Sequence, residues 1–244
     1  MEHEAYLDMA AVEAQHWWFR GRRRVLEATI RRLKLGPGAR ILELGSGTGG
    51  NLAMLSRFGT VTAVEMNETA LQISAGLGTG VDIRPGYLPD ALPLGDQKFD
   101  LICMFDVLEH VAEDEASLAV VRRRLAPGGA AVITVPAYAA LFGPHDVALH
   151  HKRRYERAEL AEKLRNAGLV VEKLSFSNAG LLPLALVSRW LDKALRRSQP
   201  SGTALPPRLV NESFAGIFGA EAGLLRWIDL PFGLSLLAVV RSGD

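Results

Sequence analysis

Apolar residues recur along this chain with two alternating periods. Short, nearly continuous apolar runs predict strands, and they cover residues 40–44, 61–65, 82–84, 99–105 and 130–135. Between these runs, apolar positions spaced as on one helical face predict helices near residues 22–34, 50–57, 68–75, 115–125 and 157–167. Two later runs, 170–176 and 234–240, predict the last strands. Strands that alternate with helices indicate an α/β fold, in which helices cover both faces of a doubly wound parallel sheet.

Two segments depart from this alternation. Residues 178–231, between the last two predicted strands, are rich in leucine and aromatic residues and contain a Pro/Ser/Gly-rich stretch at 198–207. A connection of this length is usually functional, so we predict a helical insert that caps the open edge of a ligand site. An extra pair of core helices is the alternative. Residues 1–35 predict an N-terminal helical lid, with a hydrophobic plug as the alternative, and residues 1–244 are expected to form one domain.

The formal net charge of +1 narrows the classes of partner. It offers no electrostatic basis for binding nucleic acid, so we expect no such partner. A single cysteine, Cys103, lies within an apolar strand and allows no internal disulfide, which fits a reducing compartment. The acidic N-terminus lacks the apolar segment of a signal peptide, and no uncharged apolar run reaches about 18 residues. We therefore expect a cytoplasmic protein.

The most informative stretch covers residues 39–50 and reads ARILELGSGTGG. It begins as an apolar strand with an acid inside it, Glu43, and then becomes glycine-rich. Gly45, Gly47 and Gly49 allow a sharp turn and a close approach of the backbone to a ligand. An amphipathic stretch follows, so the glycines lead into a helix. A strand, a glycine turn and a helix N-terminus together predict a site for a nucleotide-like ligand.

The neighbouring acids indicate which nucleotide-like ligand this is. Gly45, Gly47 and Gly50 also satisfy the dinucleotide pattern G-x-G-x-x-G, and Glu65 ends the next strand where an acid can accept hydrogen bonds from both ribose hydroxyls. Both features fit NAD, and an NAD-dependent oxidoreductase is one alternative. Glu43 distinguishes NAD from a second candidate cofactor. Its carboxylate would repel the pyrophosphate of NAD, and it would attract an α-ammonium group. S-adenosylmethionine carries such an ammonium and no phosphate.

Four segments in this order resemble the class I S-adenosylmethionine-dependent methyltransferases of the small-molecule type. They are the acidic glycine loop 43–49, the strand 99–105, the turn DVLEHV at 106–111, and the helix end, turn and strand at 125–135. The resemblance covers residues from about 20 to 175 and returns at the C-terminus. It implies a Rossmann-like sheet of seven strands whose last strand is antiparallel, S-adenosylmethionine as the cofactor, and methyl transfer as the reaction.

The resemblance also implies which residues hold the cofactor. Arg22 is expected to bind the cofactor carboxylate with its fork of donors, with Arg20 and Arg23 as further candidates, and Met66 is expected to pack on the adenine. Tyr87 stands where the family often has an acid, so the backbone groups of Tyr87 and Leu88 are expected to contact the adenine, with Asp90 as another candidate. Asp106 faces the methionine portion or the acceptor, or caps the following helix. The full predicted set is Arg22, Glu43, Gly45, Ser46, Gly47, Thr48, Gly49, Glu65, Met66, Tyr87, Leu88 and Asp106.

Histidines gather on the acceptor side. His145, His150 and His151 follow the fifth predicted strand, and a loop leaving the carboxyl end of a central strand is where an acceptor-side base belongs. We predict His145, His150 and His110 as catalytic residues, with Asp146 orienting the imidazole of His145. The predicted acceptor-binding residues are Trp17, Trp18, Tyr138 and His145.

The histidine-rich loop also has two plainer interpretations. His150 and His151 precede Lys152, Arg153 and Arg154, a basic run that can begin a surface helix. The histidine spacing permits a metal ion as well, but neither a cysteine nor a second acid accompanies it, so we predict no metal.

These features predict methyl transfer to a small or medium-sized, rather apolar acceptor, at oxygen, in quinone, secondary-metabolite or lipid-linked biosynthesis. The paired tryptophans and the LEHV segment are similar to those of quinone-biosynthesis O-methyltransferases. N- or C-methylation and a non-catalytic cofactor-binding partner are the alternatives. Residues 181–197 are apolar and then basic, with Trp190, Lys193, Arg196 and Arg197, which predicts peripheral contact with a membrane.

Overall fold

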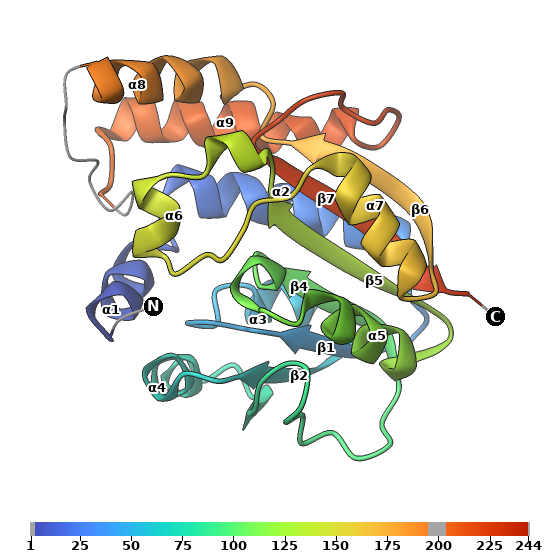
Figure 1. Cartoon of the computed structure of the whole chain (residues 1–244). Helices are drawn as coiled ribbons and strands as arrows, with labels where there is room; N and C mark the ends of the chain where they lie inside the picture. Colours follow the sequence, from blue (N-terminus) through green and yellow to red (C-terminus); the bar gives the residue numbers. More distant parts are fainter. Residues whose placement is uncertain (1–2, 195–203, 244) are drawn as a thin grey trace.

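A seven-stranded sheet forms the centre of the computed structural model, which describes residues 3–194 and 204–243 (Figure 1). The strand order is β3-β2-β1-β4-β5-β7-β6, and β7 is antiparallel to both of its neighbours while the remaining pairs are parallel. The strands are β1 Arg40–Leu44, β2 Thr60–Glu65, β3 Asp82–Pro85, β4 Phe99–Phe105, β5 Leu125–Pro136, β6 Leu169–Ser177 and β7 Ser235–Ser242. The predicted doubly wound sheet with an antiparallel last strand is confirmed.

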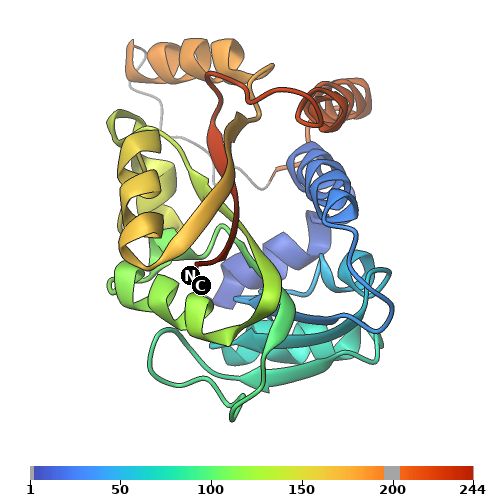
Figure 2. The same ribbon diagram turned by 90° about the vertical axis from the view of Figure 1, so that its right-hand side faces the viewer.

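Helices cover both faces of this sheet. Figure 2 shows α5 and α7 on one face, and α2 with α9 on the other. The helices are α1 His3–Val12, α2 Trp17–Arg32, α3 Leu52–Leu55, α4 Glu68–Gly76, α5 Asp114–Arg124, α6 Pro144–Ala148, α7 Arg157–Asn166, α8 Leu182–Ala194 and α9 Arg208–Leu224, with short 3₁₀ turns η1 Leu108–His110 and η2 Ala139–Leu141. The central strands are buried on both sides, which is why β1 and β4 read as continuous apolar runs rather than alternating ones.

Two element boundaries differ most from the sequence-based prediction, by about five residues each. α2 begins at Trp17 instead of residue 22, because His16 caps it and its imidazole Nδ1 accepts a hydrogen bond from Trp18 N at 3.2 Å. β5 begins at Leu125 instead of residue 130. The pairing of β5 with β4 shifts register after Phe99, so the glycine turn at 128–129 forms an irregularity within the strand instead of preceding it.

The segment between β6 and β7 contributes to the core. α9 packs along α2, and Ala215 and Phe218 of α9 are buried. Glu221, also buried, accepts hydrogen bonds from the backbone amides of Asn178, Ala179 and Gly180 at 2.6, 2.7 and 3.0 Å, and so fixes the chain where it leaves β6. This part of the insert, α9, therefore packs as a core helix.

The crossing of α2 and α9 depends on a glycine. A Cβ at Gly21 would lie 2.6 Å from Phe218 Cδ1, whereas a Cβ at Gly216 of α9 would meet nothing within 4 Å. We expect Gly21→Ala to lower the free energy of unfolding by about 1–2 kcal/mol, because overpacking outweighs the helix propensity gained. Gly216→Ala is the matched control and should raise the unfolding free energy slightly. Urea denaturation of both variants measures this, and equal midpoints would contradict the tight crossing.

Candidate active site

The carboxyl ends of β1, β2, β4 and β5 meet along one edge of the sheet, and most of the predicted site residues follow these strand ends. Open α/β sheets bind their ligands at this edge. The glycine loop follows β1, Glu65 ends β2, Asp106 follows β4 and Tyr138 follows β5. The topology therefore brings together side chains that are about 100 residues apart in the sequence.

The glycine loop has the backbone conformation that the sequence predicts. Gly45, Gly47 and Gly49 have φ angles of +69°, +54° and +89°, which favour glycine strongly. A Cβ at Gly45 would lie 2.6 Å from Val107 Cγ2, so the loop passes very close to the turn after β4. The amides of Gly45 and Ser46 both donate to Val64 O, at 2.8 and 3.2 Å, which fixes the loop against β2.

Glu43 lies beneath this loop and is only 1% exposed. Asn51 Nδ2 donates to its Oε1 at 2.9 Å, while its Oε2 and the hydroxyl of Ser46 are buried without a partner. Burial raises the pKa of Glu43 to about 7. A buried carboxylate oxygen and a buried hydroxyl, both lacking partners next to a glycine loop, fit a cationic ligand group such as an α-ammonium.

Glu65 is held rigidly at the end of β2. Its Oε2 accepts a hydrogen bond from Gly47 N at 2.8 Å, and its Oε1 accepts from Met66 N and Asn67 N, both at 2.9 Å. A carboxylate offers about four lone pairs, so acceptor capacity remains for ribose hydroxyls. The backbone amides thus position Glu65 for the ribose role that the sequence predicts.

The predicted adenine side is partly preorganised. The side chain of Met66 is largely exposed, so it is accessible to pack on an adenine ring. Tyr87 N donates to Ala91 O at 2.8 Å, and Ala91 N donates to Tyr87 O at 3.0 Å. Because Ala91 occupies both backbone groups of Tyr87, Leu88 is left as the candidate backbone contact to adenine.

Arg22 and Asp106 form an ion pair between α2 and the end of β4. The guanidinium also lies 4.4 Å from the centre of the Trp18 ring, and its Nε is buried without a partner. Asp106 adopts a left-handed conformation with φ +57°, and its side chain reaches Arg22 instead of capping η1. Such a conformation in a non-glycine residue is costly and is found often at functional sites. Arg22 can therefore bind a ligand carboxylate with donors that Asp106 does not use.

The N-terminal helix lies over the glycine loop. α1 packs beside α4 (Figure 1), and Glu13, just after α1, accepts a hydrogen bond through Oε2 from the Thr48 hydroxyl at 2.6 Å. A Cβ at Gly50 would lie 2.3 Å from Glu13 Oε1. Burial raises the pKa of Tyr6 to about 12, with a further contribution from Glu65. Sequence reasoning missed Glu13, because no local pattern links it to a loop 35 residues away.

On the acceptor side, the structure connects Asp146 to His151. His151 Nδ1 lies 2.9 Å from Asp146 Oδ1, and Asp146 also accepts hydrogen bonds from Arg154 Nε at 2.8 Å and Gly143 N at 2.9 Å. Burial alone would raise the pKa of Asp146, but the hydrogen bonds from His151 and Arg154 hold it below its usual range. The orienting role predicted for Asp146 therefore falls on His151, which lies six residues beyond His145 in the chain.

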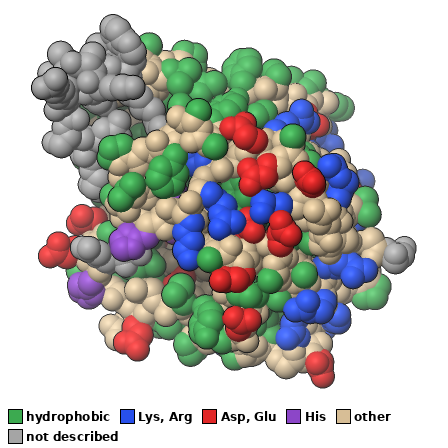
Figure 3. Space-filling view, viewed as in Figure 1, with side chains coloured by type: hydrophobic (Ala, Val, Ile, Leu, Met, Phe, Trp, Pro, Cys, Tyr) green, Lys and Arg blue, Asp and Glu red, His purple; other side chains and the backbone are tan. Residues whose placement is uncertain are grey.

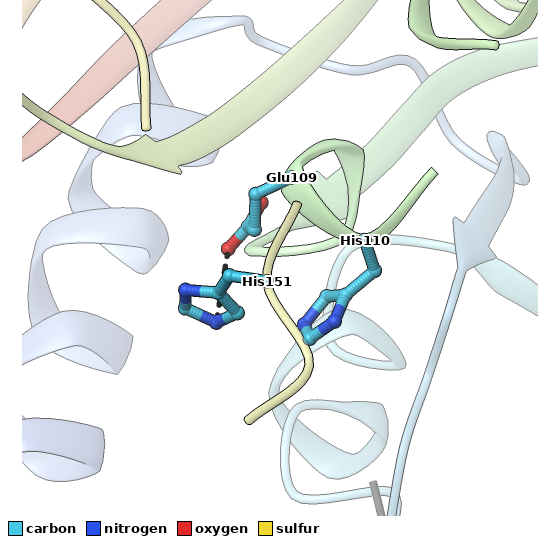
Figure 4. A group of neighbouring side chains, drawn as sticks. All are labelled: Glu109, His110 and His151. Atoms are coloured by element: carbon cyan, nitrogen blue, oxygen red, sulfur yellow. Dashed lines mark ion pairs between the residues drawn. The ribbon is translucent and has the colours of Figure 1, made fainter. Parts of the chain in front are cut away.

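Glu109, His110 and His151 form a compact group (Figure 4). The rings of His110 and His151 are nearly perpendicular with centroids 4.7 Å apart, and Glu109 Oε1 lies 4.0 Å from His151 Nε2. Burial raises the pKa of Glu109 well above its usual range, and the nearby Asp106 carboxylate adds to this. Burial lowers the pKa of His110 to about 4, so this imidazole is neutral near neutral pH.

The ring contacts of the other predicted acceptor-side residues are with different neighbours. His150 is exposed with φ +59°, and His145 lies half-buried on α6. Trp17 packs edge-on against Phe214 of α9, with ring centroids 5.5 Å apart. Tyr138 stacks on Phe176 at 5.3 Å.

A family model described as a methyltransferase domain matches residues 17–174. The chain belongs to this methyltransferase family. A ubiquinone biosynthesis O-methyltransferase from Xanthomonas euvesicatoria is 31% identical over 200 residues, which cover 71% of this chain and 83% of that protein. A protein of Mycolicibacterium smegmatis, named as a probable S-adenosylmethionine-dependent methyltransferase, is 30% identical over 175 residues, covering 70% of this chain and 66% of its own length.

Solved structures share the fold at lower identity. A chain in the complex between the Haloferax volcanii Trm112 methyltransferase activator and a methyltransferase has a TM-score of 0.62 and 20% identity, covering 99% of this chain and 94% of that one. A TehB-like S-adenosylmethionine-dependent methyltransferase from Corynebacterium glutamicum has a TM-score of 0.54 and 19% identity, covering 88% of this chain and 86% of that one. These likenesses concern the fold alone.

Family membership decides between the two cofactors that the glycine loop allows. The protein is an S-adenosylmethionine-dependent methyltransferase, and the NAD-dependent alternative is set aside. When bound, S-adenosylmethionine supplies a methyl group on an electrophilic sulfonium. The residues at the strand ends fit it: buried Glu43 lacks a partner on one oxygen, Arg22 has a spare donor, and Glu65 retains lone pairs.

Glu43 should make cofactor binding depend on pH. An ammonium group next to its carboxylate favours the ionised form, so below the pKa of about 7 each binding event must release a proton. We expect the affinity for S-adenosylhomocysteine to fall by up to about tenfold per pH unit below this pKa. Calorimetry in buffers of different ionisation enthalpy measures the released proton. Glu43→Gln should bind more weakly and lose this proton release; a wild-type protein that releases none would contradict the assignment.

Proposed function

We propose that this enzyme methylates an oxygen atom of a small or medium-sized, largely apolar acceptor, as in quinone, secondary-metabolite or lipid-linked biosynthesis. The observation that carries the proposal is His151, whose Nδ1 contacts Asp146 while its Nε2 points toward Glu109, in the cluster beside Asp106. An imidazole oriented by a carboxylate suits the removal of a proton from a hydroxyl group. The Xanthomonas relative named as an O-methyltransferase supports the same choice.

The residues on this edge suit such a reaction. The acceptor hydroxyl gives its proton to His151 Nε2, its oxygen attacks the methyl carbon, and the carbon–sulfur bond breaks with both electrons going to sulfur. Asp146, itself held by Arg154 and Gly143, stabilises the positive charge that develops on the imidazole. The partly buried apolar side chains of Trp18 and Val107 exclude water from this region.

Two acceptors that differ only in the atom to be methylated test whether the enzyme methylates oxygen. An alkylated phenol and the aniline of the same shape would be incubated with the enzyme and S-adenosylmethionine, and the products identified by mass spectrometry. The proposal expects methylated phenol and little methylated aniline. Preferential methylation of the aniline, or of a ring carbon, would overturn it.

An apolar outer surface supports a lipid-linked acceptor presented at a membrane. Leu184 and Val187 of α8, and Leu209 of α9, are 49%, 54% and 80% exposed. Figure 3 shows apolar side chains gathered over α8 at the top of the molecule. No helix in the described part of the chain is long and apolar enough to cross a membrane. The predicted basic end of this segment, Arg196 and Arg197, lies outside the described residues, as do the side chains of Trp190 and Lys193.

We expect the protein to sediment with anionic liposomes at low salt, because exposed apolar side chains enter the headgroup region. The double variant Leu184→Glu, Val187→Glu should lose most of this binding. Val170→Glu, at an exposed apolar position on β6, is the matched control and should bind like wild type. Equal sedimentation of all three proteins would show that α8 is not the contact surface.

A further inference from the structure

We propose that Glu109, His110 and His151 bind one divalent transition-metal ion, and that this ion holds the acceptor oxygen during methyl transfer. The inference deepens the proposed function and rests on it for the role of the acceptor oxygen. With the ion bound, His151 Nε2 is a metal ligand, so the ion takes over from this imidazole by lowering the pKa of the acceptor hydroxyl. The metal site itself stands on the geometry of this cluster.

The ligand atoms converge from two segments of the chain. Glu109 and His110 belong to η1, which follows β4, and His151 belongs to the loop between α6 and α7 (Figure 4). One ligand atom from each residue lies within 4.8 Å of the other two. Ligands of a tetrahedral zinc ion lie about 3.4 Å apart, so the ligand atoms need to approach one another by at most about 1.4 Å.

Glu109 is the strongest indication that a cation belongs here. Its side chain is 0% exposed, and neither carboxylate oxygen has a hydrogen-bond partner. Leaving a buried carboxyl group unsatisfied is costly, and native structures rarely do so without a ligand. The nearby cations are already paired, Arg22 with Asp106 and Arg154 with Asp146. Apart from the 4.0 Å contact with the His151 imidazole, Glu109 therefore has no cationic partner among the described residues.

The surrounding hydrogen bonds prepare both imidazoles as ligands. His151 Nδ1 is hydrogen-bonded to Asp146, which Arg154 and Gly143 hold in turn, so Nε2 presents its lone pair toward Glu109. His110 makes a hydrogen bond to the backbone of His150, which occupies one of its ring nitrogens and leaves the other. Metal-bound histidines almost always have such a second contact to a carboxylate or a carbonyl group.

The residue types in this cluster indicate which class of metal ion binds and what role the ion has in methyl transfer. Two imidazoles and one carboxylate suit zinc and similar first-row ions, and three protein ligands leave a coordination position for a water or a substrate oxygen. An acceptor hydroxyl in that position would have a lowered pKa. Its proton then passes to solvent, its oxygen attacks the methyl carbon, and the carbon–sulfur bond breaks. The sequence predicted no metal because the supporting acid, Glu109, is 42 residues from His151 in the chain.

Direct metal binding tests this proposal. The full-length protein is stripped with a chelator, saturated with S-adenosylhomocysteine, and titrated with Zn²⁺ by calorimetry; Co²⁺ absorption reports the ligand set. We expect one ion per chain with a micromolar or tighter Kd. Glu109→Gln and His151→Gln should each weaken binding by at least about 100-fold. His3→Gln, an exposed histidine on α1, is the matched control and should bind as wild type does.

The outcomes separate this inference from the proposed function. The absence of stoichiometric binding, or binding that both cluster variants retain, would overturn the metal site. Because Glu109→Gln keeps the shape of the side chain, its S-adenosylhomocysteine affinity reports whether the fold survives. Undiminished O-methylation by the stripped, chelator-treated enzyme would overturn the ion's role and leave the proposed function intact. Metal binding combined with methylation at nitrogen or carbon would overturn the proposed function and the ion's role, and leave the metal site itself intact.

Discussion

Replacing Glu65 with alanine is expected to weaken S-adenosylhomocysteine binding by at least about 100-fold, or about 3 kcal/mol. The expected loss has two sources. The ribose hydroxyls lose a charged acceptor, and Gly47 N, Met66 N and Asn67 N lose the carboxylate that positions the loop. Isothermal titration calorimetry measures the affinity directly.

Two further variants make this result specific. Glu65→Gln keeps one acceptor oxygen and should fall between alanine and wild type. Glu68→Ala removes an exposed acid from the first turn of α4 and should leave the affinity unchanged. If Glu65→Ala and Glu68→Ala bind S-adenosylhomocysteine equally well, the ribose does not contact Glu65 and the cofactor site lies elsewhere.

Removing residues 1–14 is expected to lower kcat/KM for methyl transfer by about 100-fold while the rest of the domain stays folded. This truncation deletes α1 and Glu13, and with them the 2.6 Å contact to Thr48 and the 2.8 Å hydrogen bond from Arg23 Nη2 to Glu13 O. His16 remains to cap α2. Without α1, water reaches the glycine loop and the cofactor is held less firmly.

A single substitution distinguishes a lid from a merely stabilising segment. Glu13→Gln keeps the size of the side chain and removes its charge, so it should preserve the unfolding temperature. If α1 acts as a lid, Glu13→Gln should also lower kcat/KM, but by less than the removal of residues 1–14 does. A truncated enzyme that transfers methyl groups at the wild-type rate would show that α1 is not a lid.

The sequence predicts the sheet well because its signals are local. An apolar run bounded by glycine or charged residues indicates a buried strand wherever it occurs, so the bounds of β1 and β4 agree with those predicted. Glu43, Gly45 and Glu65 could be identified for the same reason, since each has a fixed place relative to a strand end. The start of α2 was predicted late, because the capping imidazole of His16 and the packing of Trp17 on α9 are not visible in helical periodicity.

The acceptor side depends on contacts between distant segments, which a single sequence does not reveal. Asp146 stands next to His145 in the chain, yet the turn after α6 brings His151 to its carboxylate. Glu109 was recognised only as part of a motif, and its burial beside His151 becomes visible when η1 and the 149–153 loop are folded together. Likewise, the pairing of Tyr87 with Ala91 arises from a local bridge that no periodic pattern predicts.

A crystal structure of the protein with S-adenosylhomocysteine tests the central claim most directly. The account predicts ribose hydroxyls on Glu65, the ammonium group beside Glu43, the carboxylate on Arg22, and the sulfur facing the cluster of Glu109, His110 and His151. A ligand bound away from the glycine loop, or one whose sulfur faces away from this cluster, would contradict it.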